Sequence, residues 1–200
     1  MLKTFVKISN VTNLSDARYC AGMGVDMLGF VMDADSAEYV SPEKLKEIKS
    51  WLAGVQIIGE TQSTDFAEIK SMVEAYDIDL LQITDASLIN SLKELDKPLI
   101  LKFDAESAYL KENLERYAQD ATFVLLEGES LTDVFVHELQ ELSSNYEIVL
   151  GFGVNQENLA ELLESLPNLK GIALKGSEEI RPGYKNYDEL MEILEALEIE

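Results

Sequence analysis

FVKISNVTNLSDARYCAGMGVDMLGFV, residues 5–31, contains the pattern that decides the fold. A strand-sized apolar run is followed by a helix-sized amphipathic segment and then by a second strand-sized run. Parallel strands require this arrangement, because the connection between them must cross the sheet over about a dozen residues or more. The same unit occurs eight times, with apolar runs at Phe5–Ile8, Met27–Val31, Val55–Ile58, Leu80–Ile83, Leu99–Phe103, Phe123–Leu126, Ile148–Leu150 and Gly171–Leu174. Eight units close a barrel, so we predict an α/β fold, a single (β/α)8 TIM barrel over residues 1–200 with eight parallel strands and eight outer helices.

Composition narrows the function classes. The chain has 38 acidic and 16 basic residues, a formal net charge of −22, which repels nucleic acid and anionic membranes. No run approaches the roughly 18 apolar residues of a membrane span. The first residues lead directly into a strand without the apolar segment of a signal peptide, so we expect a cytoplasmic protein. The only cysteine, Cys20, lies within a predicted helix and is expected to be a buried structural thiol.

Helix signals follow each apolar run. We predict helices near 13–23, 65–75, 86–95, 106–118, 132–142, 156–166 and 187–197, and a further helix that begins at Ser41 with Pro42 in its first turn. The only histidine, His137, falls on one of these helices and is expected at the surface. The strand ends have no histidine–carboxylate cluster at ligand spacing, so neither a metal nor another cofactor is expected.

Alternation in the first strand separates two faces. Val6 and Ile8 form an apolar face that should meet the helices, which directs Lys7 and Ser9 into the barrel. A lysine inside a barrel is costly unless it is paired. Lys7 therefore needs a carboxylate partner or an anionic ligand near the barrel mouth.

Residues 6–32 also carry a family resemblance. VKISNVTNLSDARYCAGMGVDMLGFVM resembles the opening of the phosphoribosylanthranilate isomerases of tryptophan biosynthesis, whose pattern is K-I-C-G-I-T, then D-A, then G-A-D-x-x-G-F. Further matches, in register over nearly the whole chain, are Tyr39–Pro42, Leu81–Ile83, Leu125–Leu126, Gly151–Asn158 and Pro182–Lys185. The resemblance implies a (β/α)8 barrel, in agreement with the count of strands. It also implies an Amadori rearrangement that converts a phosphoribosylamine into an aminodeoxyribulose phosphate.

The resemblance assigns roles to residues, and several positions depart from the family pattern. The family's catalytic base is a cysteine at the position of Ser9, and its acid is an aspartate at the position of Glu127. Serine is a far poorer base, because its hydroxyl stays protonated near neutral pH. The family arginine that would meet the anthranilate carboxylate is replaced by Glu38. The family motif Q-L-H-G loses its histidine and glycine and keeps only Gln82 as a substrate-binding side chain.

A phosphate site is expected on the loops after the last two strands. There the resemblance implies binding by Gly151, Gly153, Lys175 and Gly176, while Phe152 replaces a glycine that would allow close approach of a phosphate.

Three functions remain open from the sequence. The first is a divergent phosphoribosylanthranilate isomerase of weak or altered activity, with Glu127 as the acid, Ser9 at the base position and Lys7 as an electrostatic partner. The second is an inactive barrel that binds a small sugar phosphate. The third is a different small-molecule enzyme that uses Lys102 or Lys175 in Schiff-base chemistry. In each case we expect a small phosphorylated or otherwise anionic ligand, no nucleic acid or membrane partner, and a monomer or homodimer.

Overall fold

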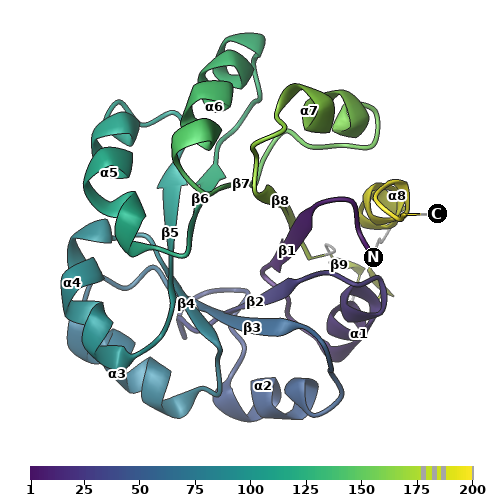
Figure 1. The fold of residues 1–200 in the computed structure, drawn as a ribbon. Helices are drawn as coiled ribbons and strands as arrows, with labels where there is room; N and C mark the ends of the chain where they lie inside the picture. The colour runs from purple at the N-terminus through teal and green to yellow at the C-terminus, as the bar shows by residue number, and fades with distance from the viewer. Residues whose placement is uncertain (177–178, 182–183, 186–187, 200) are drawn as a thin grey trace.

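A closed barrel of eight parallel strands forms the centre of the molecule. The computed structural model describes residues 1–176, 179–181, 184–185 and 188–199, and pairs the barrel strands in sequence order from β1 to β8, with β8 returning to β1 (Figure 1). The strands are β1 (Phe5–Ser9), β2 (Met27–Val31), β3 (Gln56–Glu60), β4 (Leu80–Ile83), β5 (Leu99–Asp104), β6 (Phe123–Glu127), β7 (Ile148–Leu150) and β8 (Gly171–Lys175). The predicted (β/α)8 barrel is therefore confirmed.

Helices surround this barrel (Figure 1). They are α1 (Leu14–Gly22), α2 (Pro42–Lys49), α3 (Phe66–Ala75), α4 (Ile89–Leu92) with flanking 3-10 turns η1 (Ala86–Leu88) and η2 (Lys93–Leu95), α5 (Leu110–Tyr117) followed by η3 (Ala118–Asp120), α6 (Asp133–Asn145), α7 (Leu159–Ser165) and α8 (Asp188–Ala196). A two-stranded antiparallel sheet of β9 (Glu179–Arg181) and β10 (Tyr184–Lys185) was not predicted. Within the described residues, no helix combines the length and the apolar character that crossing a membrane requires.

Alternation along the strands creates two apolar regions. Every second strand residue faces the barrel interior, which is filled by Met27, Ile58, Leu80, Ile100, Phe123, Leu125, Val149 and Ala173, with Phe5 packed against them. The intervening residues, such as Val6 and Ile8, join the larger core between strands and helices. Lys7 pairs in register with Met27 of β2 and Ala173 of β8, so it shares the interior face. The predicted inward direction of Lys7 and Ser9 is confirmed.

Local capping explains where several helices begin. Asn13 caps α1 by accepting a hydrogen bond from the backbone of Asp16 at 2.9 Å, and Ser41 caps α2 with Pro42 at its first position. The predicted start at Gln156 is wrong, because α7 begins only at Leu159.

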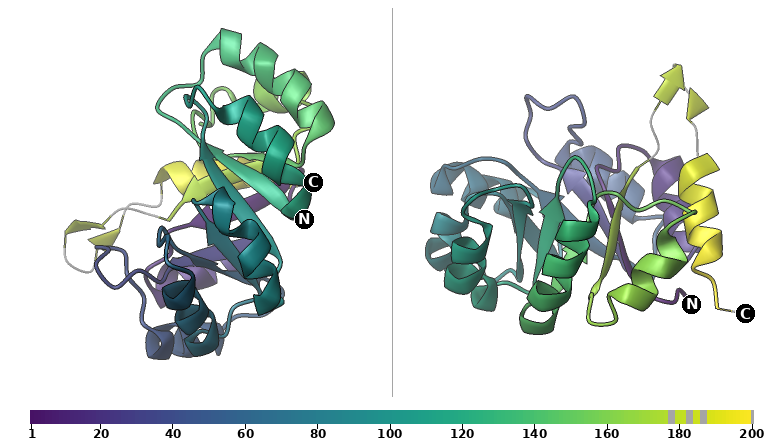
Figure 2. Two further views of the ribbon diagram at one scale, coloured as in Figure 1. Left: turned by 90° about the vertical axis from the view of Figure 1, so that its left-hand side faces the viewer. Right: turned by 90° about the horizontal axis from the view of Figure 1, so that it is seen from above.

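The two ends of the chain lie side by side at the end of the barrel opposite the mouth. Leu2 and Glu198 form an antiparallel bridge. The backbone of Lys3 donates to Leu197 at 2.8 Å, and that of Ile199 donates to Met1 at 3.1 Å. Figure 2 shows β9 and β10 projecting from the opposite end, where the strands have their carboxyl termini. This end is the barrel mouth, the usual place for a functional site in the fold.

Candidate active site

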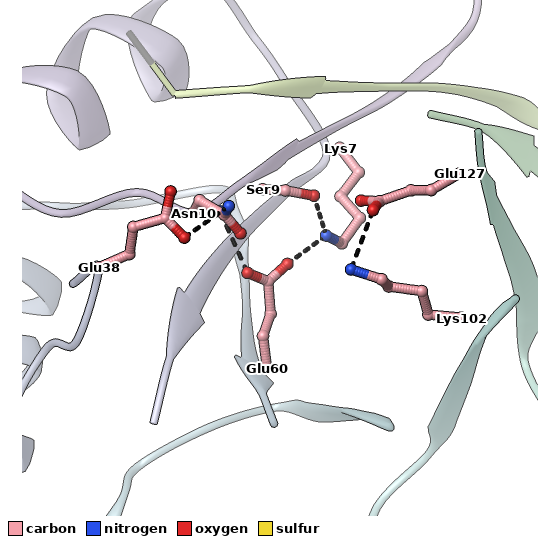
Figure 3. Close-up of polar contacts among 7 residues, drawn as sticks. All are labelled: Lys7, Ser9, Asn10, Glu38, Glu60, Lys102 and Glu127. Atoms are coloured by element: carbon pink, nitrogen blue, oxygen red, sulfur yellow. Dashed lines mark hydrogen bonds and ion pairs between the residues drawn. The ribbon is translucent and has the colours of Figure 1, made fainter. Parts of the chain in front are cut away.

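The partner of Lys7 is a carboxylate from another strand. The ammonium group of Lys7 forms an ion pair with Oε1 of Glu60 at the end of β3, and it donates a hydrogen bond to Oγ of Ser9 at 2.6 Å (Figure 3). Lys7 is completely buried, and Glu60 and Ser9 are each 4% exposed. Of the two partners that the sequence allowed for Lys7, the structure contains the carboxylate.

Glycine 29 allows this contact between strands that are not neighbours. Gly29 faces inward on β2, which lies between β1 and β3, and a Cβ atom at that position would overlap the carboxylate of Glu60. The missing side chain leaves the space through which Glu60 reaches Lys7.

Asn10 links this buried pair to the rim of the mouth. Its backbone N–H donates to Oε2 of Glu60 at 3.1 Å, and its side-chain Nδ2 donates to Oε2 of Glu38 at 2.9 Å (Figure 3). Asn10 has φ of 58°, a left-handed conformation that asparagine tolerates better than most residues. Asn10, directly after β1, therefore links the carboxylate of Glu60 at the end of β3 to that of Glu38 in the loop after β2.

The loop between β2 and α2, which contains Glu38, is anchored at its base. The backbone of Val40 donates to Val31 at 3.0 Å, and the hydroxyl group of Tyr76 donates to the carbonyl oxygen of Val40 at 2.8 Å. Burial raises the pKa of Tyr76, as does its hydrogen bond with Tyr39. These contacts fix the end of the loop close to Glu38.

A second ion pair lies on the other side of the mouth. Nζ of Lys102 in β5 is 2.9 Å from Oε2 of Glu127, the last residue of β6, and about a quarter of each side chain is exposed (Figure 3). Both residues line a cavity of about 560 Å³ together with Thr84, Asp104 and Glu129. Lys102 lies on the same strand face as the interior residue Ile100, so it points into the barrel.

Ser9 and Glu127, the predicted base and acid positions, belong to strands on different sides of the ring. Figure 3 shows both side chains pointing into the space enclosed by the strands, with the ammonium groups of Lys7 and Lys102 between the carboxylates of Glu60 and Glu127. The structure thus brings Lys7, Ser9 and Glu127 to one enclosed region.

Gln82 is a further inward polar residue of the barrel. It pairs in register with Glu60 on β3 and is 5% exposed. Its Oε1 atom is buried and has no hydrogen-bond partner in the part of the chain that the structure describes. A buried acceptor without a donor is destabilising, so this atom requires an explanation.

The structure explains the residue types at two positions of the loop after β7. Gly153 has φ of 68°, and a Cβ there would overlap Leu131. Phe152 packs its ring against Phe135 of α6, with centroids 5.8 Å apart, which places it on the β6–α6 side of Gly151.

The end of β8 lies next to the first strand. The backbone of Gly176 donates to Ser9 at 2.8 Å, and the side chain of Lys175 is exposed. The candidate phosphate loop therefore adjoins the turn that holds Ser9 and Asn10.

Other sequence expectations concern residues away from the mouth. Cys20 is buried in α1, and His137 is exposed on α6, as predicted. Among the described residues, no group of three or more His, Cys, Asp or Glu side chains is arranged to hold a metal ion.

Comparison with known proteins identifies the relationship. Residues 6–196 match the family model of N-(5'-phosphoribosyl)anthranilate (PRA) isomerase. The chain belongs to this family. The family member from Aquifex aeolicus is 25% identical over 203 residues, covering 94% of this chain and 96% of that protein. The protein from Chloroherpeton thalassium is 26% identical over 200 residues, covering 92% and 91%.

Solved structures of the family share the fold. The phosphoribosyl anthranilate isomerase of Thermus thermophilus has a TM-score of 0.80 at 24% identity, covering 97% of this chain and 98% of its own. A phosphoribosyl anthranilate isomerase in complex with reduced 1-(o-carboxyphenylamino)-1-deoxyribulose 5-phosphate has a TM-score of 0.77 at 22% identity, with the same coverage.

Proposed function

We propose that the protein is an aldose–ketose isomerase that acts on a phosphoribosylated amine, and that its activity on phosphoribosylanthranilate itself is weak. Membership of the phosphoribosylanthranilate isomerase family supports the reaction class. The observation that carries the assignment is the convergence of Ser9, Lys7 and Glu127 on one enclosed space (Figure 3).

In this reaction the ribose ring opens and a proton leaves C2. Glu127, in its protonated form, gives a proton to the ring oxygen while the bond between C1 and that oxygen breaks, which leaves a protonated imine at C1. A base then removes the C2 proton to give a neutral enolamine. A proton added to C1 and the loss of the proton of the 2-hydroxyl group then yield the ketone at C2. The acid position is at the rim of a cavity, where a substrate can reach Glu127.

Ser9 explains the expected weakness at the second step. Its hydroxyl oxygen accepts a hydrogen bond from the ammonium group of Lys7 at 2.6 Å, which makes that oxygen a poorer proton acceptor. Loss of a positioned base typically lowers a rate by about 10²–10⁴-fold. Glu38 acts against the same substrate, because it presents a negative charge at the rim where anthranilate would bring its carboxylate.

The phosphate end of the substrate is assigned to the loops after β7 and β8. Lys175, exposed at the end of β8, supplies a cation, and Gly151, Gly153 and Gly176 are the positions that the family resemblance assigns to the phosphate. Phe152, at a position where the family has a glycine, packs its ring against Phe135 of α6. Gln82 is assigned to the sugar or to the amine-derived part of the substrate.

The test is turnover of phosphoribosylanthranilate by purified wild-type protein and by Ser9→Cys. We expect slow turnover by the wild-type protein and a higher rate in Ser9→Cys, because a thiolate can accept the proton. Introducing Glu127→Gln into either protein should abolish its turnover. Wild-type turnover at the rate of an ordinary enzyme would refute the reasoning from Ser9. Heat stabilisation by the substrate without turnover in either protein would instead indicate a barrel that binds a sugar phosphate, and loss of that stabilisation in Lys175→Ala would locate the site.

A second candidate function rests on Lys102. Its ammonium group faces inward, lines the cavity and lies 2.9 Å from a carboxylate that can move protons, which is the arrangement of an amine that condenses with a carbonyl compound. Borohydride treatment in the presence of ribose 5-phosphate should then reduce an imine at Lys102, with the adduct found by mass spectrometry and missing in Lys102→Arg. The absence of an adduct in wild type removes this candidate.

A further inference from the structure

The mouth over β1 to β4 presents hydrogen-bond acceptors. We call Glu38, Glu60 and the Oε1 atom of Gln82 the acceptor cluster. Asn10 joins the first two by donating to both carboxylates, and Gln82 is the register neighbour of Glu60 on β4. All three groups are oxygen acceptors.

The charge of this cluster is only partly balanced. Lys7 neutralises Glu60 through the buried ion pair. Glu38 is exposed and receives the neutral amide of Asn10, and in the described part of the chain it forms no ion pair. Among the described residues, the carboxylate of Glu38 at the rim is thus without a counter-charge.

Gln82 independently indicates a missing donor. Its Oε1 atom is buried on the inner face of β4 and lacks a hydrogen-bond partner among the described residues. The whole residue is only 5% exposed. Native proteins rarely leave such an acceptor unsatisfied, because the desolvated oxygen loses its bonds to water without replacement. A ligand that donates an N–H group to the mouth would provide the missing bond.

Cations lie at other positions around the mouth. Lys175 is exposed at the end of β8, the neighbour of β1 on the side away from β2, and Lys102 lies on β5. A phosphorylated ligand would direct its phosphate toward β8 and its other end toward the acceptor cluster.

We infer that the amine-derived part of the substrate, the aglycone, carries neutral or cationic N–H donors, such as a carboxamide, where anthranilate carries a carboxylate. This inference rests on the proposed function, because it assumes a phosphoribosylated amine in the mouth. A carboxylate there meets Glu38 as a like charge and meets Gln82 with a second acceptor. A carboxamide of the same shape removes the charge and supplies N–H donors.

The experiment compares two unreactive ligands by isothermal titration. The first is reduced 1-(o-carboxyphenylamino)-1-deoxyribulose 5-phosphate, the compound bound in one structure of the family. The second is its o-carbamoyl counterpart, which differs only by the amide in place of the carboxylate. We expect the carbamoyl compound to bind at least about tenfold more tightly, equal to about 1.4 kcal/mol.

Two variants assign the preference to the acceptor cluster. In Glu38→Gln the preference should shrink toward parity, because the repelling charge is gone while the shape is kept. In Gln82→Met the carbamoyl compound alone should lose affinity. Glu157→Gln, an exposed acidic residue on the loop before α7, is the matched control and should leave the preference unchanged. The part of the affinity difference between the two ligands that is due to Glu38 should also fall at high salt.

The outcomes separate the two levels of inference. Tighter binding of the carboxy compound, or equal binding of both, overturns the donor-bearing aglycone and leaves the phosphoribosylated amine in place. Failure of both compounds to bind overturns both, because the sugar-phosphate part is common to the two ligands. A preference for the carbamoyl compound that survives in both Glu38→Gln and Gln82→Met also overturns the inference, since the recognition would then lie elsewhere.

Discussion

The buried pair of Lys7 and Glu60 should contribute strongly to stability only as an intact pair. In Lys7→Met, the carboxylate of Glu60 keeps the hydrogen bond from the backbone of Asn10 but loses its counter-charge in a site that is 4% exposed. Removing one partner of a buried ion pair costs about 3–5 kcal/mol. For a domain of this size each kcal/mol shifts the melting temperature by about 2–4 °C, so Lys7→Met should melt about 6–20 °C below wild type.

The double variant Lys7→Met/Glu60→Met provides the decisive comparison. Both charges are then removed, and two methionines can pack against the interior residues Met27 and Ala173. We expect the double variant to be more stable than either single variant and within about 1–2 kcal/mol of wild type, because apolar replacements of buried pairs are often nearly neutral.

Urea unfolding at neutral pH, followed by far-UV circular dichroism, measures all four proteins of this cycle. A cost below about 1 kcal/mol for Lys7→Met, smaller than any buried charge should show, would refute the reasoning. So would a double variant as unstable as the sum of the single ones, since the two residues would then act independently.

Two further predictions concern packing and pH. Gly29→Ala should lower the free energy of unfolding by about 1–3 kcal/mol, because its Cβ overlaps the carboxylate of Glu60. Gly22→Ala at the end of α1, where a Cβ meets nothing within 4 Å, should be neutral or stabilising, so equal urea midpoints for the two variants would contradict the steric explanation. Burial and Tyr39 raise the pKa of Tyr76, so its contribution to stability is complete below the unfolded pKa of about 10 and is lost as the pH rises further. Tyr76→Phe should cost about 1 kcal/mol at neutral pH and should flatten the alkaline decline, which unfolding measurements from pH 7 to 11 would test.

The barrel was predictable because its signal is repeated and physical. Each strand must be apolar to be buried, and each must be followed by a helix to return in parallel, so eight runs specify eight strands. Alternation in β1 was equally informative, because the contrast between Val6 and Lys7 distinguishes the two faces. In β5 that contrast is missing, since apolar neighbours flank Lys102 on both sides, and only the structure determines which way it points.

The partner of Lys7 was missed for a related reason. The predicted strand ended at Ile58, its last apolar residue, whereas β3 continues to Glu60. Continuing the alternation by two residues would have placed Glu60 on the inner face with Ile58. The role of Gly29 was outside the reach of sequence reasoning, because it depends on a contact between strands separated by another strand. The late start of α7 has a local cause, since Asn155 and Asn158 exchange side-chain to backbone hydrogen bonds of 2.9 and 3.0 Å before the helix begins.

The hydrogen-bonded contact between residues 1–3 and 197–199 has a practical consequence for engineering. Because Leu2 and Glu198 are already paired, a short flexible peptide could join the ends into a continuous loop, and the chain could be opened at another exposed connection. The ends lie on the face away from the mouth, so such a circular permutant with its new ends on that same face would keep every loop that bears Ser9, Glu38 and Glu127. The order in which the eight units are synthesised could thus be varied independently of the chemistry at the opposite face.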